Sequence, residues 1–156
     1  HDLEKGVQAQ NPNDRDHELA GVSQVRSLCA RLRVPTRFRE LALTVAEHHR
    51  LMINLASSST DEILRLLTRL NVFRDLDRVK SFVIACESAN SVRTNSEALN
   101  LVTELLICYA EAARNVDLTD LDASIPGGQR RGNEVKERRL IAIANAHDKW
   151  KRENLV

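Results

Sequence analysis

The sequence predicts an all-α protein. Its 156 residues include only five Gly, three Pro and 3% aromatic residues, a composition that favours helices over a sheet. Apolar residues also recur at intervals of three and four along most of the chain, which is the spacing that lines one face of a helix. A chain of this length can form one ordinary domain, or a domain with a small appendage, and can bury a hydrophobic core.

Six helices are expected from this spacing and from the breaks between apolar runs. They cover residues 17–34, 36–55, 61–71, 75–89, 96–116 and 133–154. Pro35 ends the first helix, because proline cannot continue the hydrogen-bond pattern. Thr60, followed by two acidic residues, is expected to cap the third. Leu32, Phe38 and Leu101 lie at core-facing positions of the first, second and fifth helices.

A linker is expected over residues 117–132, where proline and three glycines gather before the last helix. Pro126, Gly127, Gly128 and Gly132 make up this cluster. The sequence shows no internal repeat.

The chain has 23 Lys and Arg and 22 Asp and Glu, so its net charge is too small to attract nucleic acid to the molecule as a whole. Any binding of nucleic acid must therefore use a local basic patch. Cys29, Cys86 and Cys108 lie far apart without a zinc-binding spacing, so we expect reduced thiols in the core of a cytoplasmic protein. No apolar run approaches the roughly 20 residues of a membrane span, and no signal peptide is visible, so we expect no membrane partner.

Histidines and one aspartate form a candidate metal site. A hydrolytic metal centre needs mixed imidazole and carboxylate ligands from separate elements. The candidate ligands are His1, Asp2, His17 and His49. The alternative interpretation is that His17 starts a helix and that His49 is a hydrogen-bonded core residue. Roughly 100° around the helix from His49, His48 is expected on the surface, and His147 beside Trp150 is expected to pack.

Several motifs occur in an order that resembles the HD region of the bacterial CCA-adding tRNA nucleotidyltransferases of the multifunctional type. They are "HDLEKG", His17, "AGV", "LCARLRVP", "RELA" and "VAEHH". The later stretches "ACESAN" and "GGQRRGNEVKERRLIAI" extend the resemblance over essentially the whole chain. The "LCARLRVP" block is the most specific of these motifs.

The resemblance implies an HD-like helical domain over residues 1–93, without its first helix, and a C-terminal helical tail over residues 94–156. It also implies that His1 lies in the interior of a longer protein. In that family an N-terminal head, which nothing here matches, selects CTP and ATP and uses Mg²⁺ for nucleotidyl transfer. The part represented here would position tRNA and would not transfer nucleotides alone.

The resemblance also implies that the HD site is degenerate. HD-active members carry an aspartate after the helix histidine, where this chain has Arg50, and another family aspartate is replaced by Ala89. A guanidinium group repels a cation and cannot ligate it. A competing hypothesis is a phosphohydrolase for phosphomonoesters or 2′,3′-cyclic phosphates, with Ni²⁺ or Mn²⁺ on the candidate ligands and Lys5 steadying the phosphate. Arg50 speaks against this hypothesis, and the objection weakens if Asp16, Glu18 or Glu47 enters the ligand shell.

A local basic cluster lies near the start of the last expected helix. Its residues are Arg130, Arg131, Lys136, Arg138 and Arg139. Such clusters bind RNA phosphates without reading bases, and the family resemblance implies contact with the tRNA backbone. The alternative is a solvated helix face whose cations pair with Glu134 and Glu137. A further alternative for the whole chain is a structural module that binds a protein partner, which an exposed apolar stripe without a cationic rim would favour.

Overall fold

The computed structural model describes residues 14–52, 54–89, 96–119, 121 and 128–154, with the side chains of residues 14–20, 89, 96–99 and 129 left out. The described part contains six α-helices and no strand, which confirms the all-α prediction. The helices are α1 (Asp14–Arg31), α2 (Thr36–His48), α3 (Thr60–Leu70), α4 (Asp77–Ala89), α5 (Ser96–Arg114) and α6 (Gly128–Asn154). Two short 3₁₀ helices, η1 (His49–Met52) and η2 (Leu55–Ser57), connect α2 to α3.

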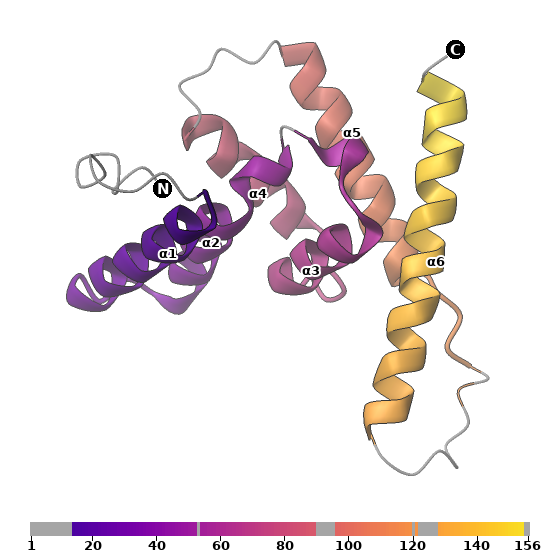
Figure 1. Cartoon of the computed structure of the whole chain (residues 1–156), viewed down its shortest axis with the longest axis horizontal. Coiled ribbons are helices and arrows are strands. Elements are labelled where there is room, and N and C mark those ends of the chain that lie inside the picture. The colour runs from indigo at the N-terminus through magenta and orange to yellow at the C-terminus, as the bar shows by residue number, and fades with distance from the viewer. Residues whose placement is uncertain (1–13, 53, 90–95, 120, 122–127, 155–156) are drawn as a thin grey trace.

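The helices form an elongated array with α1 and α2 at one end and the long helix α6 at the other (Figure 1). α1 packs along α2, and α5 packs along α6. Between these two pairs, α3 contacts α2, α4, α5 and α6. α4 also contacts both α2 and α5, so α3 and α4 together join the N-terminal pair to the C-terminal pair.

The main hydrophobic core lies among α3, α4, α5 and α6. Its fully buried side chains include Leu66, Leu67, Phe82, Leu106, Tyr109 and Ile143. A second, smaller core lies between α1 and α2 and contains Val25, Cys29, Leu43 and Ala46. Both cores use residues three or four positions apart, as the sequence pattern predicted.

The cap of α3 differs by one residue from the prediction. Ser59, and not Thr60, is the N-cap, and its hydroxyl oxygen accepts a hydrogen bond of 3.3 Å from the Glu62 amide. The Glu62 carboxylate in turn accepts a hydrogen bond of 3.0 Å from the Ser59 amide. This reciprocal capping box satisfies two backbone donors at the start of the helix, which is why the boundary lies at Ser59.

The end of α1 uses a residue with positive φ. Arg33 has a φ of 51°, its amide donates to the Ala30 carbonyl at 3.2 Å, and the Val34 amide donates to the Cys29 carbonyl at 2.9 Å. These bonds are those of a Schellman motif, in which glycine is the usual residue at this position. The motif reverses the chain into Pro35, which caps α2.

Three expected core residues are instead exposed. Leu32 is 62% exposed, Phe38 60% and Leu101 44%. Helical spacing identifies the apolar face of a helix but does not tell how far along that face a neighbouring helix extends. Phe38 lies near the start of α2, about one and a half turns before the buried part of that helix begins at Leu43.

Two helix boundaries also differ from the prediction. α2 ends at His48 and continues as η1, whereas one continuous helix was expected. α6 begins at Gly128, so the predicted linker over residues 117–132 ends earlier, and Gly132 is helical. A glycine in a helix costs about 1 kcal/mol, and packing of α6 against α5 and α3 offsets this cost. The predicted domain boundary at residues 93 and 94 lies outside the described residues.

Candidate nucleic-acid interface

The predicted basic cluster lies on the first half of α6, and its members have different surroundings. Arg130 and Arg131 are exposed in the first turn. Arg138 donates to the Glu134 carboxylate at 2.7 Å and to the Asp117 carbonyl at 2.8 Å. This pair with Glu134 is one of those that the solvated-face interpretation anticipated. Arg138 therefore holds the segment before α6 against the helix.

Arg139 is held by stacking on an aromatic ring. Its guanidinium carbon lies 3.6 Å from the centroid of the Phe73 ring, in the geometry of a cation–π contact. The Arg139 Nε atom is buried and has no hydrogen-bond partner among the described residues. Burial lowers the pKa of the Arg139 guanidinium. Arg139 is thus a fixed cation with an unsatisfied donor.

Arg139 lines a groove of about 700 Å³ between α3 and α6. The lining residues are Glu47, His48, Asp61, Leu64, Arg65, Thr68, Arg69, Gly132, Val135, Lys136 and Arg139. Arg65 and Arg69 lie one turn apart on the exposed side of α3 and face the groove together with Lys136 of α6. Four cations from two helices therefore border one groove.

A second groove lies on the other side of α3, toward α1 and η1. Its lining residues are Val22, Arg26, Glu47, His48, Arg50, Leu51, Asn54, Ser57, Ser58, Glu62, Arg65 and Arg69. Arg65 and Arg69 line both grooves, so the two grooves meet along α3. Together they are bordered by six Lys and Arg against three Asp and Glu. We call this surface the basic grooves.

The three carboxylates of the basic grooves are engaged by neighbouring groups. Asp61 accepts an ion pair of 2.9 Å from Lys136, and this hydrogen bond lowers the pKa of the Asp61 carboxyl. Glu47 lies 3.6 Å from Arg69 and 3.8 Å from His48. Glu62 belongs to the α3 capping box, which lowers its pKa. The surplus of positive charge suits a polyanionic ligand.

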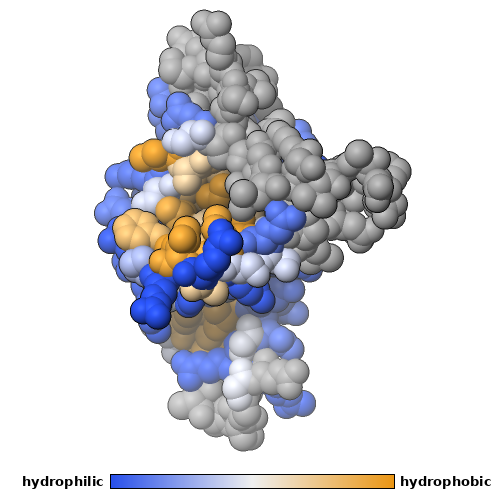
Figure 2. All heavy atoms as spheres, turned by 90° about the vertical axis from the view of Figure 1, so that its left-hand side faces the viewer, coloured by the Kyte–Doolittle hydropathy of each residue, from blue (hydrophilic) through white to orange (hydrophobic). Residues whose placement is uncertain are grey.

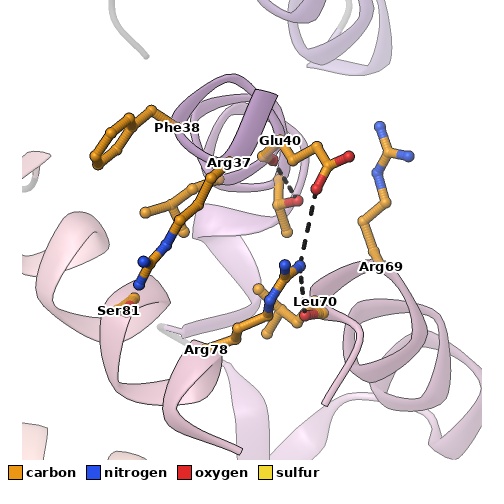
Figure 3. A pocket seen from close by; sticks show the side chains of 9 residues that line it. Arg37, Phe38, Glu40, Arg69, Leu70, Arg78 and Ser81 are labelled. Atoms are coloured by element: carbon orange, nitrogen blue, oxygen red, sulfur yellow. Dashed lines mark hydrogen bonds and ion pairs between the residues drawn. The ribbon is translucent and has the colours of Figure 1, made fainter. Parts of the chain in front are cut away.

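A small cavity of about 90 Å³ lies among α2, α3 and α4 (Figure 3). Arg78 reaches across it, with one Nη atom 3.5 Å from the Leu70 carbonyl oxygen and 3.8 Å from the Glu40 carboxylate. Arg37 extends from α2 toward Ser81 on α4 (Figure 3). These contacts bind the three helices together, and the cavity is too small for a nucleotide.

Sequence comparison finds similar proteins over almost the whole chain. It is 31% identical over 152 residues to a multifunctional CCA protein of Vibrio parahaemolyticus, and 34% identical over 151 residues to one of Xanthomonas axonopodis. The chain is thus similar to multifunctional CCA proteins over nearly its whole length. These matches cover 96% and 95% of this chain but only 37% of each relative, so the chain spans little more than a third of their length. It corresponds to their C-terminal portion.

A multifunctional CCA protein of Haemophilus influenzae gives the same result, with 32% identity over 92% of this chain and 35% of the relative. No family model matches the chain. No solved structure matches it either. In the part of the chain that the structure describes, no helix combines the length and the apolar character that a membrane crossing needs.

The candidate metal ligands are only partly described. His1, Asp2 and Lys5 lie outside the described residues, and of His17 only the backbone is described, on α1. His49 is half-buried, and its Nδ1 lies 3.1 Å from the Val45 carbonyl oxygen. Since a carbonyl oxygen only accepts, Nδ1 carries the proton in this contact.

No group of three potential metal ligands occurs among the described residues. Glu47, proposed as a substitute carboxylate, points to Arg69 on α3. Arg50 is exposed at the second groove. His48, expected on the surface, has a side chain that is only 15% exposed, and it lines both grooves. The metal site stays a prediction.

The interaction-module hypothesis also stays a prediction. Figure 2 shows hydrophobic residues gathered in a patch with hydrophilic residues around it. The large apolar side chains that are exposed in the described residues are Leu32, Phe38, Ile84, Leu101 and Ile141. A cationic side chain, Arg37, adjoins Phe38 (Figure 3), which is a border that this hypothesis did not predict.

Sequence reasoning found the cations of α6 but missed those of the other elements. Arg26, Arg65 and Arg69 were not singled out, although Arg65 and Arg69 have the four-residue spacing of one helix face. That spacing was the available signal. Their proximity to α6 depends on the packing of α3 against α6, which local sequence does not reveal.

Proposed function

We propose that this chain is the tRNA-holding part of a CCA-adding tRNA nucleotidyltransferase. In the whole protein, a nucleotidyltransferase head would use CTP, ATP and Mg²⁺ to complete the 3′ end of tRNA. The residues present here would bind and position the RNA. The observation that carries this proposal is the run of six cations along the basic grooves, which crosses from α1 over α3 to α6.

The physical basis is local charge. The chain as a whole is nearly neutral, with a net charge of +1, so the surplus of cations at the grooves marks one surface out. Lys and Arg side chains bind RNA mainly through backbone phosphates, and folded RNA is recognised largely by its shape. A groove that follows α3 between two helix pairs offers such a surface without requiring base contacts.

Binding of deacylated tRNA across a salt series tests the proposal. The wild-type chain should bind at low salt, and its affinity should fall steeply as counterions compete for the phosphates. An Arg65→Gln, Arg69→Gln variant should bind about tenfold or more weakly, with a salt slope lower by roughly one for each lost phosphate contact.

The matched control is Lys149→Gln, Arg152→Gln, which removes the same charge from the far end of α6, outside both grooves. It should retain most of the affinity. Absence of wild-type binding at low salt would overturn the proposal. Equal losses in both double variants would show only a general charge effect, which also contradicts a role for the grooves. Arg138 and Arg139 are unsuitable for charge reversal because their side chains hold neighbouring segments in place.

A further inference from the structure

The groove between α3 and α6 contains a distinct arrangement at its α6 side. Arg139 is stacked on Phe73, its buried Nε lacks a hydrogen-bond partner among the described residues, and Lys136 lies one turn earlier on the same helix. Arg65 faces them from α3. Stacking holds the guanidinium plane in one orientation. The Arg139 side chain therefore loses less conformational entropy when a ligand binds to it.

We propose that this arrangement is a single phosphate subsite, in which Arg139, Lys136 and Arg65 hold one phosphodiester group of bound RNA. We further propose that Asp61 forms an ion pair with Lys136 in the absence of RNA and that the RNA phosphate replaces the Asp61 carboxylate on binding. The inference rests on the proposed function and names where one phosphate is held. It also assigns Asp61 as a residue that weakens binding.

The chemistry of the three cations suits a phosphate. A planar guanidinium presents parallel donors that match phosphate oxygens, whereas a lysine supplies a compact charge. In this groove both kinds come from one helix, and Arg65 adds a charge from the facing helix. At about 700 Å³ the groove admits a nucleotide backbone.

Asp61 and Lys136 form an exchangeable pair. Their atoms lie 2.9 Å apart, but their side chains are 45% and 54% exposed. Ion pairs this exposed contribute little to stability, because water competes with both partners. An RNA phosphate beside Arg139 can therefore replace the carboxylate at Lys136 without disturbing the fold.

The decisive variant gains function. Asp61→Asn releases Lys136 from its ion pair and should tighten tRNA binding by about threefold to tenfold at low salt. The slope of affinity against salt concentration should become steeper by roughly one, as expected for one additional phosphate contact. The matched control is Glu153→Gln, which removes the same charge and frees Lys149 from an ion pair of 3.9 Å elsewhere on α6. It should change affinity less than twofold. Because misfolding does not tighten binding, the gain cannot come from an unfolded variant.

Arg139→Lys tests the guanidinium itself. It keeps the charge but loses the planar donors, and should weaken binding by about fivefold or more while circular dichroism shows an unchanged fold. Inorganic phosphate, compared with chloride at equal ionic strength, tests the alternative that free phosphate is the natural occupant. Displacement of tRNA by low millimolar phosphate would overturn the assignment to an RNA phosphodiester.

The two proposals fail in different ways. If the wild-type chain binds no tRNA, the proposed function is wrong. If it binds tRNA, but Asp61→Asn binds no more tightly than Glu153→Gln, the phosphate subsite is overturned and the proposed function stands. Wild-type affinity in Arg139→Lys would overturn the subsite in the same way.

Discussion

The hydroxyl of Tyr109 on α5 is hydrogen-bonded to Nδ1 of His147 on α6. Tyr109 is fully buried, and the two ring centroids lie 5.9 Å apart. Burial raises the pKa of Tyr109 to about 12, so the phenol stays protonated at neutral pH. The bond joins two long helices through the main core, and it confirms that His147 is a packing residue.

Removing this bond should lower stability. Tyr109→Phe keeps the ring but leaves the imidazole without its partner, so the free energy of unfolding should fall by about 1–2 kcal/mol. Urea unfolding followed by circular dichroism measures the change. In a His147→Gln background the same substitution should cost less, because the partner is already altered. An unchanged midpoint for Tyr109→Phe alone would show that the bond contributes nothing.

Acidification should weaken the fold through His147. Burial, helped by Lys151, lowers the pKa of His147 in the folded state below its ordinary value of 6.5. The unfolded chain therefore binds a proton at higher pH than the folded chain does. This contribution is complete above about pH 6.5 and is lost progressively as the pH falls below that value. Urea midpoints measured between pH 8 and pH 5 should fall less in His147→Gln than in wild type, and parallel curves would contradict the assignment.

The contribution of the α3 capping box to stability should be measurable by truncating the Ser59 side chain. Ser59→Ala removes the hydroxyl that accepts from the Glu62 amide, and should cost about 1 kcal/mol. Thermal unfolding provides the measurement. Ser88→Ala is the control, because its exposed hydroxyl only donates back to the Ile84 carbonyl within α4, and it should change stability by less than about 0.5 kcal/mol. Equal effects of both substitutions would argue against a cap at Ser59.

The end of α1 offers a stabilising substitution. Arg33→Gly relieves the cost of about 1–2 kcal/mol for a left-handed residue, offset by the greater freedom of glycine in the unfolded chain. Because Arg33 has a φ of 51°, we expect a net gain of about 0.5–1 kcal/mol in chemical unfolding. Arg26→Gly, in the middle of the same helix, should instead destabilise by about 1 kcal/mol. A loss of stability in Arg33→Gly would mean that other contacts of Arg33 dominate.

Local pattern was enough to predict the helices and part of the core. Val79, Leu105 and Ile143 are buried where the three- and four-residue spacing placed an apolar face. Motifs such as "LCARLRVP" were enough to predict the resemblance, because a block of eight positions that matches at seven seldom arises by chance. The predicted site residues at the start of the chain remain predictions, since His1, Asp2 and Lys5 lie outside the described residues.

The sequence by itself determined the all-α class, the order of the helices and the resemblance to the C-terminal portion of multifunctional CCA proteins, because propensity, spacing and motif identity are properties of neighbouring residues. Only the tertiary structure decided which cations share a surface. Arg65 and Lys136 lie far apart in the chain and line one groove because α3 packs against α6. It also decided that Phe38 is exposed and that Tyr109 meets His147. The reason is physical: a helical pattern defines which face is buried, whereas packing between helices defines what that face meets.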